Sequence, residues 1–422
     1  MVFFIIWIFM SKPKLPPKIL IFSQTFVPDP ASVGQHITDV AIEMARRGYQ
    51  VRVYTSARGY ENPTVKYPAR ENLQGVDVRR LGLASFGKKS IFTRILGTFS
   101  FMMQCIFLAL FTPKVAGIFF STSPPLIGIA PCIAKFFRGI PIVYWAMDLN
   151  PDQLISMGKI TATSLPARVL ETVNRVILKR ANWIFALDRF MAERLLLRGD
   201  YAAKISVMPP WSHENHMVPV ARDSNPFRQR HNLDGKFVVM YSGNHSPANP
   251  LTTLLQAAVH YKDDPDLRFL FVGGGLAKKE VEATMKEHDL KNVLSLPYQP
   301  LAELGNSLSA ADVHIVSLGD KMVGIIHPCK IYGAMAIGRP ILYFGPKPSH
   351  VSDILEQHHL GWHVAHGDVA GAIKMLDEIR RTPVEKRDQM GRLAQHVLAE
   401  TMGQQRLCER VCVEMERAMG LK

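Results

Sequence analysis

The segment His327–Pro340, HPCKIYGAMAIGRP, holds the residues of this 422-residue chain that are best suited to binding an anion. Lys330 lies at an expected helix start, where its ammonium and the free backbone N–H groups would face the same negative charge. Gly333 lies on that helix and costs roughly 1 kcal/mol relative to alanine, so we expect another segment to pack closely there. Arg339, before the next strand, is either a further cation or a solvated loop residue. The segment predicts a diphosphate-binding site around Lys330.

Two glycine turns in the same half of the chain follow expected strands. Tyr241–Asn249 has the sequence YSGNHSPAN, in which Gly243 and Asn244 would present N–H groups to a phosphate. Phe271–Gly275 has the sequence FVGGG, with Gly273 as the first of its three glycines. Because a simple turn needs only one glycine, this turn is interpreted as functional.

A third glycine turn, Val27–His36 or VPDPASVGQH, lies in the first half of the chain. Gly34 would let the backbone approach a ligand where an expected helix offers free N–H groups and its positive dipole end. His36 would add a proton or a hydrogen bond. A lone glycine is a weak signal, and a plain tight turn is the alternative.

Two carboxylates flank a turn after another expected strand, in Trp145–Asp152, WAMDLNPD. Asp148 is nearer the strand end, where it would bind an acceptor hydroxyl or act as a base. Asp152 is better explained as an Asx turn or a helix cap.

Short apolar runs, typical of strands buried on both faces of a parallel sheet, precede these loops. The expected strands are Lys18–Phe22, Val51–Thr55, Ala116–Phe120, Ile140–Trp145, Trp183–Ala186, Ile205–Met208, Phe237–Tyr241, Leu267–Val272, Val293–Leu296, Val313–Val316 and Pro340–Phe344. Ligands of such sheets bind beyond the carboxyl ends of the strands, which is where the loops lie.

The strands fall into two series, which predicts an α/β fold of two facing, Rossmann-like, doubly wound domains. We expect an N-terminal domain over residues 18–210, a polar linker over 211–226 and a second domain over 227–383. Residues 384–422 are expected to form C-terminal helices that pack back on the N-terminal domain.

The net charge of +14 lies entirely in residues 1–210, and residues 211–422 are balanced. The most apolar stretch, Ile91–Phe111, is flanked by Lys88, Lys89 and Lys114, as suits the surface of an anionic membrane. The alternative is a buried core helix with solvated ends. Nucleic-acid binding would explain the charge but none of the glycine loops, so it is not expected.

The remaining features concern compartment and chain start. The five cysteines form no C-x2-C pair, which indicates a reducing cytoplasm and no cysteine metal site. The apolar Met1–Met10 is too short to span a bilayer and lacks the basic n-region of a signal peptide. It is either a shallow anchor, or Met10 is the true start.

In this order, the segments resemble the GT-B glycosyltransferases, specifically the retaining nucleotide-sugar enzymes of family 4, from Lys18 to about Arg417. The resemblance rests on KILIFSQTFVPDPASVGQHITDVAIEMARRGYQVRVYT, PPW, YSGN…LTTLLQAA, LRFLFVGGG, NVLSLPYQP, LSAADVHIVSL and GAMAIGRPIL. DLNPD and Pro328–Tyr332 resemble the corresponding segments of the family branch that builds surface and exopolysaccharide repeat units.

The resemblance implies that the second domain holds a nucleotide-sugar donor, expected to be a UDP-sugar, and the first an acceptor. Pro297 and Tyr298 would meet the nucleobase, with Gly243, Asn244 and Lys330 on the diphosphate. Gly34 would close over the phosphates from the first domain. No resident metal or other cofactor is expected.

The sequence departs from the family where anchors for the sugar and the diphosphate are usual. The two glutamates of E-x7-E fall at Ile325 and Gly333, and a common first-domain histidine falls near Met147. An arginine and a lysine fall at Asn244 and Asn249. The cations and donors that remain are Lys330, Arg339, His327, His36 and the helix N-termini.

We therefore expect a glycosyltransferase that serves a lipid-linked or polysaccharide acceptor from the cytoplasmic face of the membrane, as a peripheral protein. Retention of configuration follows from the resemblance alone. Two alternatives stay open: a catalytically silent relative that acts as a binding partner in a glycan assembly complex, and a nucleotide-sugar 2-epimerase.

Overall fold

The computed structural model describes residues 16–29, 31–59, 64–82, 91–212 and 217–422. Met1–Met10, Lys88 and Lys89 lie outside the described residues. The chain divides into two compact units. Unit 1 comprises the described residues up to Tyr144, with Arg180–Trp183 and Cys412–Lys422; unit 2 comprises Trp145–Lys179 and Ile184–Val411. The domain boundaries expected at residues 210, 226 and 383 remain predictions, because the compact units are assembled from several separate segments of the chain.

The first eight strands form one sheet in the order β3-β4-β2-β1-β5-β6-β7-β8. The strands are β1 (Lys18–Phe22), β2 (Gln50–Ser56), β3 (Arg70–Leu73), β4 (Val76–Leu81), β5 (Val115–Ser121), β6 (Ile142–Trp145), β7 (Trp183–Ala186) and β8 (Ile205–Val207). The helices along this part of the chain are α1 (Ser32–Arg46), α2 (Ile91–Phe111), α3 (Ile129–Arg138), α4 (Asp152–Ser156), α5 (Leu165–Arg180) and α6 (Arg189–Leu196). β1 pairs in parallel with both β2 and β5, so the strand order reverses between β1 and β5.

The second sheet has six strands in the order β11-β10-β9-β12-β13-β14, and the chain winds outward in both directions from β9 and β12. The strands are β9 (Phe237–Ser242), β10 (Leu267–Val272), β11 (Val293–Leu296), β12 (Val313–Ser317), β13 (Ile341–Phe344) and β14 (Gly361–Val364), all parallel. This order is that of a doubly wound nucleotide-binding sheet, whose ligands lie at the reversal point. The α/β, Rossmann-like fold expected from the sequence is confirmed.

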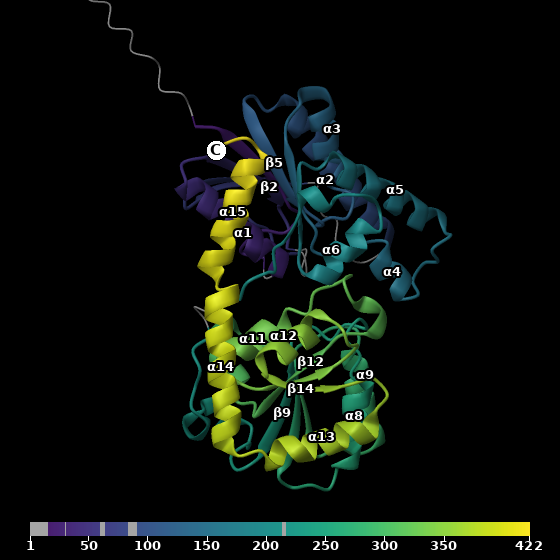
Figure 1. Cartoon of the computed structure of the whole chain (residues 1–422), viewed down its shortest axis with the longest axis vertical. Helices are drawn as coiled ribbons and strands as arrows, with labels where there is room; N and C mark the ends of the chain where they lie inside the picture. Colours follow the sequence, from purple (N-terminus) through teal and green to yellow (C-terminus); the bar gives the residue numbers. More distant parts are fainter. Residues whose placement is uncertain (1–15, 30, 60–63, 83–90, 213–216) are drawn as a thin grey trace, which may run out of the picture. The chain divides into compact units, whose positions relative to one another are not determined.

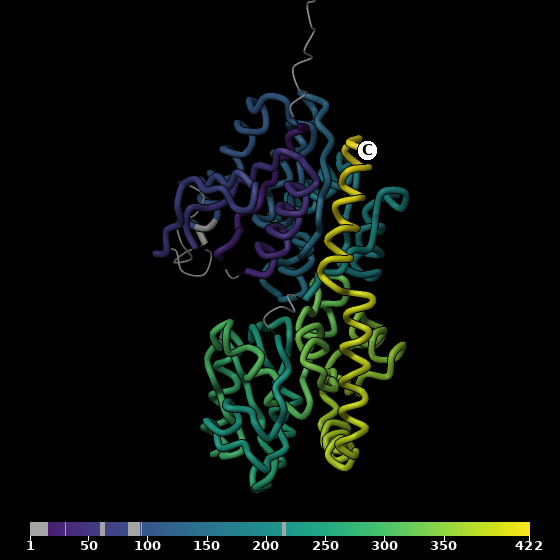
Figure 2. Tube along the Cα trace, turned by 90° about the vertical axis from the view of Figure 1, so that its left-hand side faces the viewer, coloured from purple at the N-terminus to yellow at the C-terminus, as the bar shows by residue number. Residues whose placement is uncertain are grey.

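The later helices surround the second sheet in unit 2 (Figure 1). They are α7 (Pro226–Arg230), α8 (Thr252–His260), α9 (Lys278–Glu287), α10 (Leu304–Ser309), α11 (Lys330–Ile337), α12 (His350–His358), α13 (Val369–Arg381) and α14 (Val384–Met402), followed by α15 (Gln404–Ala418). Helices α8, α9 and α13 share one apolar cluster with the sheet, and α11, α12 and α14 share another. α14 runs alongside α11 and α12 (Figure 2).

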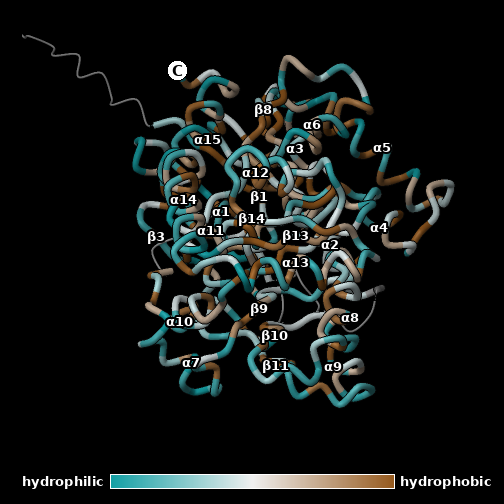
Figure 3. The backbone as a smooth tube through the Cα atoms, turned by 60° about the horizontal axis from the view of Figure 1, so that its bottom comes forward, coloured by the Kyte–Doolittle hydropathy of each residue, from teal (hydrophilic) through white to brown (hydrophobic). Residues whose placement is uncertain are grey.

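Burial on both faces explains the apolar strand sequences. In β9, Val239 and Tyr241 pack into one cluster and Val238 and Met240 into another. The backbone coloured by hydropathy shows the contrast with outer helices such as α7, which are largely hydrophilic (Figure 3). Alternating residues thus face opposite layers, and each adds apolar burial.

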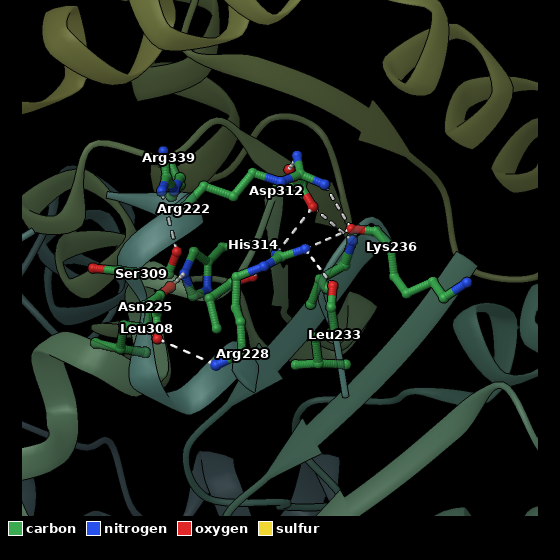
Figure 4. Close-up of polar contacts among 12 residues, drawn as sticks. Arg222, Asn225, Arg228, Leu233, Lys236, Leu308, Ser309, Asp312, His314 and Arg339 are labelled. Atoms are coloured by element: carbon green, nitrogen blue, oxygen red, sulfur yellow. Dashed lines mark hydrogen bonds and ion pairs between the residues drawn. The ribbon is translucent and has the colours of Figure 1, made fainter. Parts of the chain in front are cut away.

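A buried polar network closes the amino-terminal edge of the second sheet (Figure 4). Arg228, 1% exposed, donates to the carbonyl oxygens of Ala310 and Leu233, each at 2.6 Å. Asp312 accepts from the backbone N–H of Val238 at 2.8 Å and lies 3.5 Å from Arg228. Because both terminal nitrogens of the Arg228 guanidinium and the Asp312 carboxylate bond within the protein, the network is structural.

The chain ends in unit 1. Glu416 accepts from Arg47 of α1 at 3.3 Å, and Glu414 accepts from the indole of Trp183 at 2.7 Å. A methyl group on Gly117 of β5 would collide with the side chain of Met419. Residues 412–422 therefore pack on α1 and on the first sheet.

Candidate functional site

The glycine turns after β9 and β10 lie against each other at the carboxyl edge of the second sheet. Gly243 N–H donates to the carbonyl of Val272 at 2.8 Å, and His245 N–H donates to that of Gly274 at 2.7 Å. Gly243 and Gly273 have φ angles of +126° and +129°, and a methyl group on Gly273 would collide with the Gly243 carbonyl. Only glycine fits this approach of two backbones.

Lys330, the first residue of α11, completes this edge. A methyl group on Gly243 would lie 2.8 Å from Cε of Lys330, so the lysine stem lies directly on the glycine turn. Its Nζ is 5.2 Å from the centre of the Tyr241 ring. Burial lowers the pKa of Lys330 to about 8. A poorly solvated ammonium at the positive end of a helix is suited to an anionic ligand, which would raise the pKa again.

Tyr298 borders the same turns. Its hydroxyl donates to the carbonyl of Gly274 at 3.2 Å, and a methyl group on Gly274 would lie 3.0 Å from its ring. The residue is 53% exposed, so much of its surface is open to a ligand. Pro297, which follows β11, accepts from the Gln299 side chain at 2.9 Å. An exposed aromatic side chain next to an anion site is suited to a nucleobase.

Asn244 is exposed beside these residues, and its side chain leaves no room for a methyl group on Gly275. The second sheet therefore brings together Gly243, Asn244, Gly273, Tyr298 and Lys330, which lie on four separate segments of the sequence.

Asp148 and Asp152 have different surroundings in unit 2. Burial raises the pKa of Asp148 to about 6, and the carboxylate is close enough to Cys329 for its charge to act on that thiol. Asp152 instead forms ion pairs with Arg198 and, at 3.7 Å, with Arg194. Asp148 has the properties of a base near neutral pH, whereas Asp152 is structural.

Gly34 and His36 belong to α1 in unit 1. A methyl group on Gly34 would lie 3.0 Å from the backbone nitrogen of Phe26, so the glycine lets the helix pack on the preceding loop. His36 is 3% exposed, and its Nδ1 lies 2.7 Å from the carbonyl oxygen of Ser32. Both residues thus have a packing role as well as the ligand role predicted for them.

Two expectations for the 327–340 segment are wrong. A methyl group on Gly333 would meet only Leu308, at an ordinary 3.9 Å, so no segment packs closely there. Arg339 lies beyond the other end of α11 from Lys330, where it donates to Ser309 O at 3.1 Å and lies 3.8 Å from Asp388. It is neither solvated nor beside Lys330.

Sequence reasoning missed two buried side chains that contact residues of the candidate site. His245, 0% exposed, lies on the β9 turn, where its Nδ1 is 3.0 Å from Gly243 O and burial lowers its pKa to about 4. Asp188, which caps α6, lies 2.8 Å from the Nδ1 of His327. The position of Asp188 directly after a strand was the available signal.

Fold and site together define a class: a two-sheet α/β protein with a candidate anion site at the reversal point of its second sheet. Residues 223–397 match the family model described as "Glycosyl transferases group 1", and residues 32–211 match that of the "Glycosyl transferase 4-like domain". Since the two models together span most of the chain, the chain belongs to the glycosyltransferases, and its fold is GT-B.

Individual proteins agree with this assignment. The chain is 26% identical over 258 residues to a "Probable glycosyltransferase WbjE" of Pseudomonas aeruginosa, covering 61% of this chain and 64% of the relative. It is 24% identical over 341 residues to the "Putative colanic acid biosynthesis glycosyl transferase WcaI" of Escherichia coli K12, covering 76% and 81%. The structure of Anabaena HepE in complex with UDP and glucose superposes with a TM-score of 0.71 at 17% identity, covering 95% of this chain and all of that one.

Proposed function

We propose that the chain transfers a sugar from a nucleoside diphosphate donor, a UDP-sugar, to a lipid-linked or polysaccharide acceptor. The observation that carries the proposal is the position of Lys330, whose stem lies on Gly243 at the reversal point of the second sheet. The UDP bound by HepE supports the choice of nucleotide, and the colanic acid function in the name of WcaI supports the class of acceptor.

The diphosphate leaving group would be stabilised by the cation of Lys330 and by the backbone N–H of Asn244. Fixed donors of this kind act where negative charge develops in the transition state, and the proposal needs no resident metal. The phosphate contact expected from the Gly243 N–H is wrong, because that N–H donates to the Val272 carbonyl. Tyr298 would pack against the base. Substitution on the donor's front face, with retained configuration, is part of the proposal through the family resemblance.

Asp148 is the proposed acceptor-side group. A carboxylate with a pKa near 6 would accept a hydrogen bond from the acceptor hydroxyl and take its proton as the glycosidic bond forms. A ligand role for Gly34 and His36 of α1 stays part of the proposal.

A membrane surface is the proposed location of the acceptor. Helix α2 exposes Ile95, Phe99, Met103, Phe107 and Phe111, with exposed fractions between 47% and 67%. The four-residue spacing puts these side chains in one stripe along the helix. We call this set the α2 stripe. No helix in the described part of the chain is long and apolar enough to cross a bilayer.

Phe136 and Phe137 of α3, which packs on α2, are 64% and 69% exposed and enlarge the apolar surface. The positive charge of the first 210 residues favours an anionic interface. We propose a peripheral position at the cytoplasmic face of the membrane.

A silent binding partner is the second candidate, because Ile325 and Gly333 stand where the family carries glutamates. Release of UDP from a panel of UDP-sugars in the presence of lipid extract separates the two. Turnover by the wild type that is lost in Lys330→Ala supports the transferase. Binding of UDP-sugars without turnover across acceptors would instead favour the silent partner.

A further inference from the structure

Four side chains of unit 2, three of them buried and that of His350 partly buried, form a continuous hydrogen-bonded chain. Asp188 Oδ2 lies 2.8 Å from His327 Nδ1, and His327 Nε2 lies 2.7 Å from the hydroxyl of Tyr332. The same hydroxyl lies 3.0 Å from His350 Nε2. Asp188 is 3% exposed, Tyr332 2% and the His327 side chain 1%. We call these residues the Asp188–His350 chain.

One arrangement of protons satisfies every member. Asp188 accepts through Oδ1 from the backbone N–H of Met191 at 2.8 Å and through Oδ2 from Nδ1–H of His327. His327 Nε2 is then an acceptor for the hydroxyl of Tyr332, whose oxygen accepts from Nε2–H of His350. Burial lowers the pKa of His350 to about 3, in keeping with a neutral ring that carries one N–H.

The charge state of Asp188, at one end of the Asp188–His350 chain, follows from its contacts. Burial opposes ionisation of Asp188, but the hydrogen bonds from His327 and from the backbone N–H of Met191, together with the electrostatic effect of the two histidines, outweigh it and leave the pKa of the carboxyl below its usual value. The chain thus ends on a carboxylate that also caps α6. Charge-assisted hydrogen bonds of this kind are shorter and stronger than neutral ones.

The chain holds the backbone on both sides of Lys330. His327 lies three residues before the lysine and Tyr332 two residues after it, and both are anchored outside their own segment, on Asp188 and His350. Between these anchors, Lys330 has its stem against Gly243. A small displacement of the 327–332 backbone would move the ammonium away from the glycine turn.

Asp188, His327 and His350 each have a potential metal-ligand atom within 4.8 Å of those of the other two. The hydroxyl of Tyr332, however, lies within hydrogen-bond distance of both imidazoles, and His327 Nδ1 is already bonded to the carboxylate. The geometry favours hydrogen bonds over coordination.

We propose that Asp188, His327, Tyr332 and His350 are positioning residues, which fix the start of α11 and so hold Lys330 where the donor diphosphate binds. The identity of that ligand rests on the proposed function. The residues act through Lys330 and do not touch the reacting atoms.

Cys329, next to Lys330, provides a probe of this backbone that needs no ligand. It is the exposed one of the five cysteines; Cys105, Cys132, Cys408 and Cys412 are buried. The rate at which iodoacetamide alkylates Cys329, followed by peptide mass spectrometry, reports how firmly the 327–332 segment is held.

Tyr332→Phe removes the central hydroxyl and keeps the ring, and Asp188→Asn keeps the shape but removes an acceptor and the charge. Tyr343→Phe is the matched control: this buried hydroxyl donates to Pro346 O at 3.2 Å and accepts from Ser349 Oγ at 2.9 Å, outside the chain. Each variant is assayed for Cys329 alkylation and for the KM and kcat of UDP-sugar turnover.

Tyr332→Phe is expected to raise the alkylation rate, and the control is not. Asp188→Asn should raise it as well, but this variant also removes a negative charge that raises the pKa of the Cys329 thiol, so Tyr332→Phe decides the alkylation test. If Lys330 is correctly placed in only a tenth of the molecules, the apparent donor KM rises about tenfold. We expect kcat to stay within roughly threefold, since the correctly placed fraction still reacts. A fall in kcat with unchanged KM and alkylation would overturn the proposal, as would wild-type values for both variants.

The proposed function and the positioning role of the Asp188–His350 chain are tested by different measurements. If the wild type neither binds nor turns over any nucleotide sugar, the proposed function fails, while the alkylation rates still decide whether the chain holds the segment. An alkylation rate that rises on adding EDTA to the wild type would overturn the proposal in favour of a metal site.

Discussion

Asp148 and Asp152 show how surroundings give one residue type two roles. Asp152 forms ion pairs with Arg198 and Arg194, so its charge is compensated. Burial alone raises the pKa of Asp148 to about 6, so its ionised form is costly in the folded state. A carboxylate kept at such a cost is a candidate for function.

We predict that Asp148→Asn stabilises the protein and abolishes transfer. Because the pKa of Asp148 is raised in the folded state, the wild type loses stability as pH rises from about 4 to 6. The variant should therefore gain roughly 1–3 kcal/mol at pH 7.5 and nothing near pH 4. Urea unfolding at both pH values measures the gain.

The control is Asp152→Asn, which removes a partner of Arg198. It should destabilise by about 1 kcal/mol, because Arg198, whose side chain is 10% exposed, then keeps only Glu171 as a counter-charge. A loss of stability in both variants would refute the distinction between the two carboxylates.

Gly333 gives a second prediction. Since a methyl group there meets only Leu308 at 3.9 Å, Gly333→Ala should stabilise α11 by about 0.5–1 kcal/mol, through reduced freedom of the unfolded chain. The shift of the urea midpoint measures it. Gly34→Ala is the contrast: the methyl group would press on the Phe26 backbone, so this variant should lose stability.

At the residue scale, the sequence predicted the positions of residues that follow a strand or begin a helix. Gly243, Asn244, Gly273 and Lys330 follow strands or begin a helix, and the sheet brings them together as expected. Asp188 meets His327 across 139 positions of sequence, and no local pattern announces such a pair. The close packing inferred at Gly333 was wrong because a glycine's cost in a helix does not reveal what lies beside it.

At the scale of elements, the apolar runs predicted the strands that are buried on both faces. The β3–β4 hairpin was missed because β3 has no buried residue and only every second residue of β4 is buried, with charges such as Arg70, Glu71 and Asp77 among them. β14, with the sequence GWHV, lies at the sheet edge and has only one fully buried residue. Edge strands carry a weaker apolar signal because neighbours cover less of them.

Helix α2 carries the element-scale prediction. Replacing Phe99 and Phe107 of the α2 stripe by serine should reduce binding to vesicles containing anionic phosphatidylglycerol by at least about tenfold, since each phenyl ring contributes apolar burial. Both residues are more than half exposed, so folding should be unaffected.

Vesicle flotation measures the binding, and Val384→Ser of α14, at 51% exposed, is the control. Electrostatic attraction predicts weaker binding at high salt and to neutral phosphatidylcholine. Equal flotation of the α2 variant and the wild type would contradict a membrane role for the stripe.

At the scale of the whole molecule, buried histidines set the response to acid. Burial lowers the pKa of His245 and His314 to about 4 and that of His350 to about 3. Below about pH 6.5 these three histidines bind protons in the unfolded chain but stay neutral in the folded protein. Stability should therefore fall as pH drops from about 6.5 to 4, and Asp148 offsets this only in part.

Guanidinium unfolding between pH 7.5 and 4.5 measures this fall. In His314→Gln the free energy of unfolding should fall less steeply with decreasing pH. The slope should be smaller by about 1.4 kcal/mol per pH unit, which corresponds to the uptake of one proton fewer on unfolding. An identical slope in the variant would show that His314 does not stay neutral in the folded protein.

The central claim, that this glycosyltransferase holds the diphosphate of its donor at Lys330, is tested most directly by equilibrium binding. Titration calorimetry of UDP should be run on the wild type, on Lys330→Ala and on Lys347→Ala, whose exposed lysine pairs with Glu356. Loss of the buried cation should weaken UDP at least about tenfold, or 1.4 kcal/mol, while Lys347→Ala binds as the wild type does. Equal affinity of Lys330→Ala and the wild type would contradict the claim.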